Sequence, residues 1–209
     1  MPRKTTILIL ILATVTGILL FLAVSEGKKP QAPKATITPT KTQVQKTARI
    51  FFSPQNIDLS SATGSAVSTV DILVDTGGSQ IAGVQIEAQY DPKSLTRLGL
   101  IPAADSQGFF GNQANILFNE IIPATGRISF AIAISPDQSP KNGVGKIATL
   151  NFQRNFYATS SATTINFLDK TLVTILGENE SVLKEALPLN ITLSSPITQP
   201  PYIPPTANQ

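Results

Sequence analysis

The stretch that decides the fold of this chain reads IAGVQIEAQYDPKSL, from Ile81 to Leu95. From Val84 to Tyr90 apolar and polar residues alternate strictly, which is typical of a β-strand with one face in the core and one in water. The strand is expected to stop at Asp91-Pro92, because proline has no N–H for the ladder and both residues favour a turn. We therefore expect a strand, a turn, and a return of Leu95 to the core.

Most of the chain after this stretch, and much of what precedes it, repeats the same kind of pattern. Short alternating or apolar segments bounded by Gly, Pro and Asn predict further strands, and no helical period is sustained beyond the N-terminal region. The expected fold class is all-β: an antiparallel β-sandwich of about nine strands, with a closed barrel as the alternative. The further strands are expected at residues 48–52, 67–75, 95–101, 116–121, 127–134, 146–153, 163–168, 172–176 and 187–193.

The two ends of the chain have a different character. Arg3 and Lys4 precede an uncharged run, residues 5–24, which is long enough to cross a bilayer as a helix. We expect an N-terminal transmembrane helix within residues 1–25, a single-pass anchor with its N-terminus cytoplasmic and the domain extracytoplasmic. A cleaved signal peptide is the alternative. A Pro-, Thr- and Lys-rich linker (26–47) and a Pro-rich tail (195–209) are expected to flank a folded domain at 48–194.

The composition excludes most enzyme classes. The chain has no cysteine, histidine or tryptophan, which removes thiol nucleophiles, Ser-His-Asp triads and the usual zinc ligands. Glu87 and Glu120 are not placed by any pattern as the facing acid pair that glycoside hydrolysis needs. Charged residues make up 14% of the chain, and its net charge of +3 comes largely from its N-terminal part. We therefore expect no catalytic residues, no cofactor, no metal site and no nucleic-acid partner.

Three blocks of sequence, in this order, resemble the cohesin domain of bacterial scaffolding proteins. The resemblance covers most of residues 48–194 and implies a nine-stranded jelly-roll sandwich without catalytic activity. It also implies a protein partner, because cohesins hold a small calcium-binding module, dockerin, against one flat sheet face. The three blocks are Ile81-Ala82-Gly83-Val84 running into Tyr90-Asp91-Pro92 and Leu95; Gly126 followed by Ile128-Ser129-Phe130-Ala131; and Gly145 followed by Ile147-Ala148-Thr149-Leu150-Asn151-Phe152.

The outward row of the strand after Ile81 is the candidate partner-binding face. It carries Gln85, Glu87 and Gln89, and Ser129 and Ala131 join it if the strand from residue 127 lies alongside. The resemblance implies that a dockerin-like module docks here. An ordinary solvated sheet face is the alternative interpretation, because antiparallel sheets commonly leave one face wet.

The resemblance also implies a difference in the partner. In cohesins of cellulosomes an Asn and an Asp on this strand hydrogen-bond the dockerin, and the matching positions here are Gly83 and Gln85. Gly83 has no side chain and Gln85 no charge, so a divergent partner, or none, stays open.

Two further functions remain open at this point. A carbohydrate-binding module of the same sandwich superfamily would bind a polysaccharide, and it requires an exposed aromatic platform. We expect Tyr90 to be buried, and Phe109-Phe110 to cover one end of the sandwich rather than to form such a platform. A structural spacer at the cell surface requires no ligand.

Overall fold

The computed structural model describes residues 14–16, 18–19, 21, 44–61 and 66–193. The chain forms two units, Met1–Thr42 and Gln43–Gln209. In the first unit the described residues are helical.

The expected transmembrane helix needs a correction. Within the described residues no helix is long and apolar enough to cross a bilayer, which takes about 20 residues. The prediction of an N-terminal transmembrane helix as part of the fold is therefore wrong on this finding. Most of residues 5–24, most of the linker 26–47 and the whole tail 195–209 lie outside the described residues.

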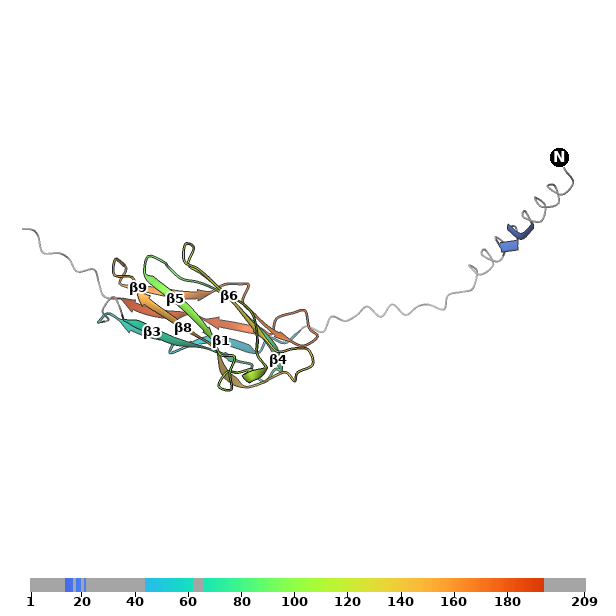
Figure 1. Cartoon of the computed structure of the whole chain (residues 1–209), viewed down its shortest axis with the longest axis horizontal. Coiled ribbons are helices and arrows are strands. Elements are labelled where there is room, and N and C mark those ends of the chain that lie inside the picture. The colour runs from blue at the N-terminus through green and yellow to red at the C-terminus, as the bar shows by residue number, and fades with distance from the viewer. Residues whose placement is uncertain (1–13, 17, 20, 22–43, 62–65, 194–209) are drawn as a thin grey trace, which may run out of the picture. The chain divides into compact units, whose positions relative to one another are not determined.

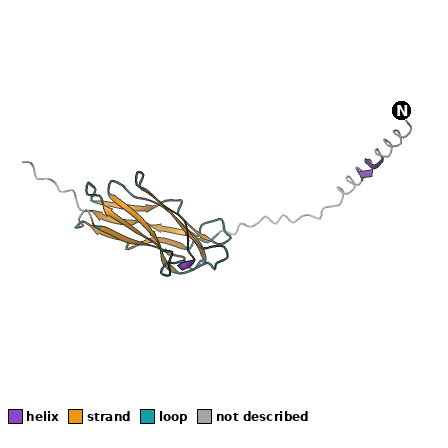
Figure 2. Ribbon diagram, viewed as in Figure 1, coloured by secondary structure: helices purple, strands orange, loops and turns teal. Residues whose placement is uncertain are grey.

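The described part of the second unit consists of β-strands and one short 3-10 helix, η1, at Gly111–Gln113 (Figures 1 and 2). Its twelve strands within residues 44–61 and 66–193 are β1 (Ala48–Ser53), β2 (Asn56–Leu59), β3 (Val67–Asp75), β4 (Ile81–Gln89), β5 (Leu95–Pro102), β6 (Asn115–Ile122), β7 (Arg127–Ala133), β8 (Val144–Arg154), β9 (Ala162–Phe167), β10 (Leu172–Ile175), β11 (Leu183–Leu187) and β12 (Leu189–Leu193).

The strands form two sheets that pack as a sandwich (Figure 1). The five-stranded sheet has the order β11-β1-β3-β8-β5. The seven-stranded sheet has the order β2-β12-β9-β4-β7-β6, with β10 also paired to β4.

The expectation of about nine antiparallel strands is corrected by two short additions. Strand β11 pairs with β1 in parallel, and β2 pairs with β12 in parallel, so both sheets are mixed. The sequence predicts a single strand over residues 187–193, whereas β11 ends at Leu187 and β12 begins at Leu189. Pro188 separates them, because proline cannot donate a ladder hydrogen bond.

The core lies between the two sheets and is filled by the apolar residues of each alternating strand. On β4, Val84, Ile86 and Ala88 are buried as expected, and Tyr90 is only 4% exposed. Burial raises the pKa of the Tyr90 hydroxyl. Each large apolar side chain that is fully buried contributes about 1.5–3 kcal/mol, and the largest include Phe52, Phe110, Phe130 and Phe152.

The turn after β4 forms as the sequence predicts. The Asp91 carboxylate accepts hydrogen bonds from the Lys93 N–H at 2.9 Å and from the Ser94 hydroxyl at 2.6 Å. These two bonds hold the pKa of Asp91 below its ordinary value, and the bond from Ser94 has the larger effect. Leu95 follows with no exposed surface and begins β5 in the other sheet.

Candidate docking face

Strands β4, β7 and β6 lie side by side in the seven-stranded sheet and turn one set of side chains away from the core. Their antiparallel register sets these outward side chains in three rows across the strands. We call the nine residues the docking face. Its rows are Gln85, Ala131 and Phe118; Glu87, Ser129 and Glu120; and Gln89, Arg127 and Ile122.

Glu87 is held on this face by two side chains of β7. Its Oε2 accepts hydrogen bonds from Nε and Nη2 of Arg127, at 3.0 and 2.8 Å, and from the Ser129 hydroxyl at 2.8 Å. Glu87 is 7% exposed, whereas 38% of the Arg127 side chain is exposed. Charge-assisted hydrogen bonds are about twice as strong as neutral ones, so the carboxylate is fixed in position.

The charge of Glu87 is also set by these contacts. Burial alone would raise its pKa, yet hydrogen bonds from Ser129 and Arg127 and the charges of Arg127 and Lys170 bring the pKa below its ordinary value. Glu87 is therefore ionised at neutral pH, and Arg127 offsets its charge within the face.

The backbone of Glu87 is held from the opposite edge of β4. Strands β9 and β10 each pair with a part of β4 and leave Glu87 between them. The Thr171 hydroxyl fills this gap: it donates to the Glu87 carbonyl at 2.8 Å and accepts from the Glu87 N–H at 3.1 Å. The Leu168 N–H donates to the same carbonyl at 2.7 Å. These contacts join the Glu87 backbone to the segment between β9 and β10.

The β10 side of the docking face is closely packed. Gln85 lies between Leu172 of β10 and Ala131 of β7. A Cβ atom on Gly83 would lie 3.1 Å from both the Thr174 hydroxyl and the Ala133 methyl group. There is therefore little space for a side chain at position 83. A larger residue in place of Gly83 would have to displace Thr174 and Ala133.

Strand β6 gives the docking face an apolar rim. Phe118 is 39% exposed and Ile122 is 38% exposed, and Ile116 and Leu117 on the same edge strand are more exposed still. The register shifts at Leu117, between Ile116 and Phe118. Grouped apolar side chains on an exposed edge strand mark interaction surfaces or aggregation sites.

Comparison with solved structures identifies this arrangement of strands. A type I cohesin–dockerin complex from Clostridium thermocellum matches with a TM-score of 0.58 and 12% identity, over 73% of this chain and 97% of that chain. CaCohA2 from Clostridium acetobutylicum matches with a TM-score of 0.55 and 16% identity, over 72% and 92%. The chain has a cohesin-like fold. The seventh ScaB type I cohesin from Pseudobacteroides cellulosolvens has a TM-score of 0.53 and 16% identity, over 73% and 96%.

At these identities the likeness concerns the fold of the cohesin-like domain. No family model and no curated protein sequence matches the chain. The family resemblance drawn from the three sequence blocks is thus supported by the arrangement of the strands.

The cohesin-like domain brings together all five residues of the predicted partner-binding face. Ala131 lies opposite Gln85, and Ser129 lies opposite Glu87, while Gln89 completes the outward row of β4. Two of the five are buried where the sequence leads us to expect an outward, solvated row: Ala131 is 4% exposed, and Glu87 is 7% exposed because its carboxylate contacts β7. Partner binding by these residues stays a prediction.

Sequence reasoning missed Arg127 and the apolar rim of the cohesin-like domain. Arg127 begins the strand beside β4, but only the register shows that it reaches Glu87. On β6 the register shift at Leu117 sends Phe118 outward beside Ala131. That shift hides the rim from a simple alternation pattern. Unbroken apolar residues at 116–118 are the one signal that could have pointed to it.

The two acids of the docking face are not arranged as glycoside hydrolysis requires. Glu87 and Glu120 lie on either side of Ser129 on one sheet face, whereas glycoside hydrolysis needs two acids that flank a bound substrate. The Glu87 carboxylate also forms an ion pair with Arg127. In the part of the chain that the structure describes, no three acidic side chains group as a metal site.

Proposed function

We propose that the cohesin-like domain binds a dockerin-like protein module through its docking face. The observation that carries the proposal is the combination of an ordered Glu87–Arg127 centre with an exposed apolar rim at Phe118 and Ile122. Cohesin–dockerin complexes of this fold from Clostridium thermocellum and Clostridium acetobutylicum support it.

The order of the docking face favours association. Ser129 and Arg127 already donate hydrogen bonds to Glu87, so little side-chain freedom is lost when a partner covers these three residues. Binding surfaces that are ordered in advance reach higher affinity because they avoid this entropy cost. Interfaces also combine an apolar part with a polar part, which matches the rim on β6 and the polar rows on β4 and β7.

The proposed partner has a mixed surface. Its apolar side chains pack against Phe118 and Ile122, and its polar groups hydrogen-bond the side chains of Gln85 and Glu120. A partner that relies on an Asn and an Asp at Gly83 and Gln85 would lose those bonds here, so we propose a divergent dockerin-like module.

A matched pair of exposed isoleucines tests the docking face. Ile122 lies on the face, and Ile101 of β5 points outward from the other sheet and is 57% exposed. We expect Ile122→Asp to abolish binding to a dockerin-like module and Ile101→Asp to leave it unchanged. The measurement is surface plasmon resonance of the full chain against a panel of purified, calcium-loaded dockerin modules, with EDTA as a further control, since metal binding stabilises such folds.

Two outcomes would overturn the proposal. If no module of the panel binds the wild-type chain, the dockerin-like partner is wrong. If one binds and the two variants bind it equally well, the partner is right but the face is wrong.

We also propose that the domain acts outside the cytoplasm. Arg3 and Lys4 followed by the uncharged residues 5–24 support this, because such a pattern is typical of an export signal. Protease added to intact native cells should degrade the chain, while a cytoplasmic marker protein survives. Protection of the chain under these conditions would contradict the proposal.

A further inference from the structure

A groove lies beside β1 on the five-stranded sheet, away from the docking face of the seven-stranded sheet. Its volume is about 490 Å³, within the range of about 300–1,000 Å³ that is usual for ligand sites. It lies where the chain leaves β1 in one sheet and enters β2 in the other. The side chains that carry the argument are Arg49, Phe51, Gln55, Asn56, Asp75 and Leu187.

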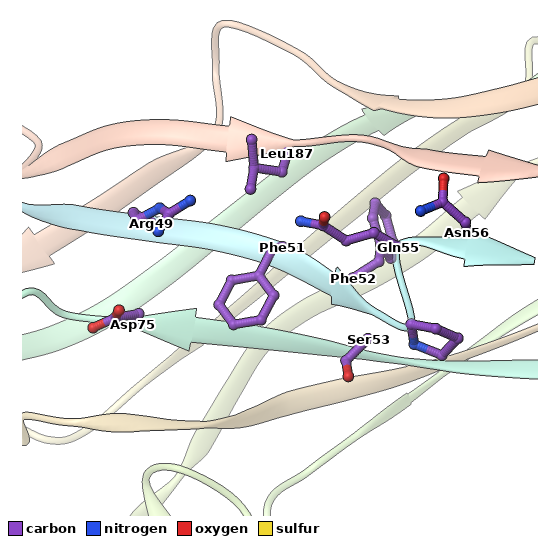
Figure 3. A pocket seen from close by; sticks show the side chains of 9 residues that line it. Arg49, Phe51, Phe52, Ser53, Gln55, Asn56, Asp75 and Leu187 are labelled. Atoms are coloured by element: carbon purple, nitrogen blue, oxygen red, sulfur yellow. The ribbon is translucent and has the colours of Figure 1, made fainter.

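An apolar surface forms the middle of this groove. Phe51 points outward from β1, is half-buried, and lies next to Leu187 of β11 in register. Figure 3 shows the Phe51 ring with Arg49 and Asp75 toward one end and Gln55 and Asn56 toward the other. A ligand that lies across the ring would therefore meet planar polar side chains at both of its ends.

Several of these polar groups retain free hydrogen-bonding positions. Asp75 accepts one hydrogen bond through Oδ1, from the Gly77 N–H at 3.0 Å. Asn56 Oδ1 accepts from the Asn190 side chain at 3.1 Å, which leaves the Asn56 NH₂ group to donate elsewhere. The Gln55 amide makes no side-chain hydrogen bond within the part of the chain that the structure describes. An amide of this kind both donates and accepts.

Charge narrows the class of ligand. Arg49 makes an ion pair with Glu185 of the neighbouring strand and lies opposite Asp75 in the β1–β3 register. The single cation of the groove is thus already matched by carboxylates, which disfavours a phosphate or another strong anion as ligand. An apolar ring flanked by groups that donate and accept suits a neutral molecule with one C–H face and several hydroxyls, which is the chemistry of a sugar ring.

We propose that this groove binds a neutral oligosaccharide chain, with one sugar ring on Phe51 and hydroxyls hydrogen-bonded by Gln55 and Asp75. Arg49 and Asn56 are exposed at opposite ends of the groove, so a chain can extend past the central ring at both ends. The site is independent of the docking face and would allow the domain to hold a glycan and a protein partner at once.

A second pair of aromatic side chains is less suited to this role. Phe156 and Tyr157, in the loop after β8, are 77% and 84% exposed. Their ring centroids are 5.5 Å apart, but the ring planes are at 90° to each other. Such a pair offers no shared flat surface to consecutive sugar rings, and it serves as the competing site in the test.

The test is a titration of the full chain with cellohexaose, xylohexaose, mannohexaose and chitohexaose, followed by calorimetry and by amide chemical shifts. We expect at least one hexasaccharide to bind and to shift the amide signals of residues 49–56. Phe51→Ala should weaken binding by about tenfold or more, since one aromatic contact is lost. Gln55→Ala should also weaken sugar binding. This variant should fold normally, because the Gln55 amide makes no side-chain hydrogen bond among the described residues. Phe118→Ala, on the docking face, should leave sugar binding unchanged.

Three outcomes would overturn the inference. The first is that none of the four hexasaccharides binds. The second is that Phe51→Ala and Gln55→Ala both bind as the wild type does. The third is that Tyr157→Ala abolishes binding while Phe51→Ala does not, which would place the sugar on the loop after β8. None of these outcomes bears on dockerin binding, which is measured separately with Ile122→Asp.

Discussion

A Cβ atom on Gly126 would lie 2.1 Å from the carbonyl oxygen of Tyr90, so the turn before β7 packs against the end of β4 only through a glycine. Gly126 has a φ of +71°, and its own carbonyl accepts the Tyr90 N–H at 2.9 Å. This contact joins two of the three cohesin-like sequence blocks. It also lies next to the pair Gln89 and Arg127, which belongs to the docking-face row that includes Ile122.

We predict that Gly126→Ala lowers the free energy of unfolding by more than about 2 kcal/mol, because the left-handed conformation alone costs about 1–2 kcal/mol and the overlap with Tyr90 adds to it. Gly111→Ala is the matched control: its φ is +63°, and nothing lies within 4 Å of its Cβ position. Urea denaturation of both variants measures the difference. Equal losses would show that the Tyr90 contact is unimportant.

Much of the sandwich could be predicted from sequence because the two faces of its strands differ in polarity. Val70, Ile72 and Val74 of β3 alternate with Asp71 and Asp75, and the strand forms at the residues expected. A single-residue shift of such a strand would expose its whole apolar set, so the pattern leaves one stable arrangement.

The remaining features depend on contacts between distant segments. Strand β2 has only four residues and lies in a polar part of the sequence. It forms a strand through its parallel pairing with β12. The burial of Glu87 depends on the register of β4 with β7, which brings Arg127 and Ser129 to its carboxylate. The alternation of the sequence predicts that Glu87, Arg127 and Ser129 point outward. It does not predict which residue of β7 lies opposite Glu87, because that depends on the register of two distant strands.

Loss of Arg127 should destabilise the domain. Arg127→Met removes two of the three hydrogen bonds to the buried Glu87 carboxylate, and we expect a loss of about 1–3 kcal/mol. Lys146→Met is the control, because Lys146 Nζ is 3.7 Å from Asp71 Oδ1 and both side chains are more than a third exposed; such pairs contribute about 0–1 kcal/mol. Thermal and urea unfolding measure both variants. A loss for Arg127→Met no greater than that of the control would contradict the assigned role of the pair.

The contribution of Glu87 to stability should depend on pH. Its pKa in the folded domain is below the ordinary value of 4.5, so ionised Glu87 stabilises the fold above that pH, and the stabilisation is lost as pH falls through the lowered value. The stability of the wild type relative to Glu87→Gln should therefore be greatest near neutral pH and shrink below pH 4.5. Asp91, whose pKa is also lowered, is present in both proteins and cancels in the difference. Urea denaturation between neutral and acidic pH measures it, and a difference that does not change with pH would contradict the assignment.

The edge strand β6 should limit the solubility of the isolated protein. It is the last strand of its sheet, and Leu117 is 64% exposed among other apolar residues; unprotected apolar edges of this kind pair with other chains, and a lysine on the edge prevents it. We predict that Leu117→Lys reduces light scattering of concentrated protein without changing its unfolding temperature. Val144→Lys is the control, because Val144 is 62% exposed but lies on β8, inside the five-stranded sheet. If both lysines improve solubility equally, net charge rather than the exposed edge is the cause.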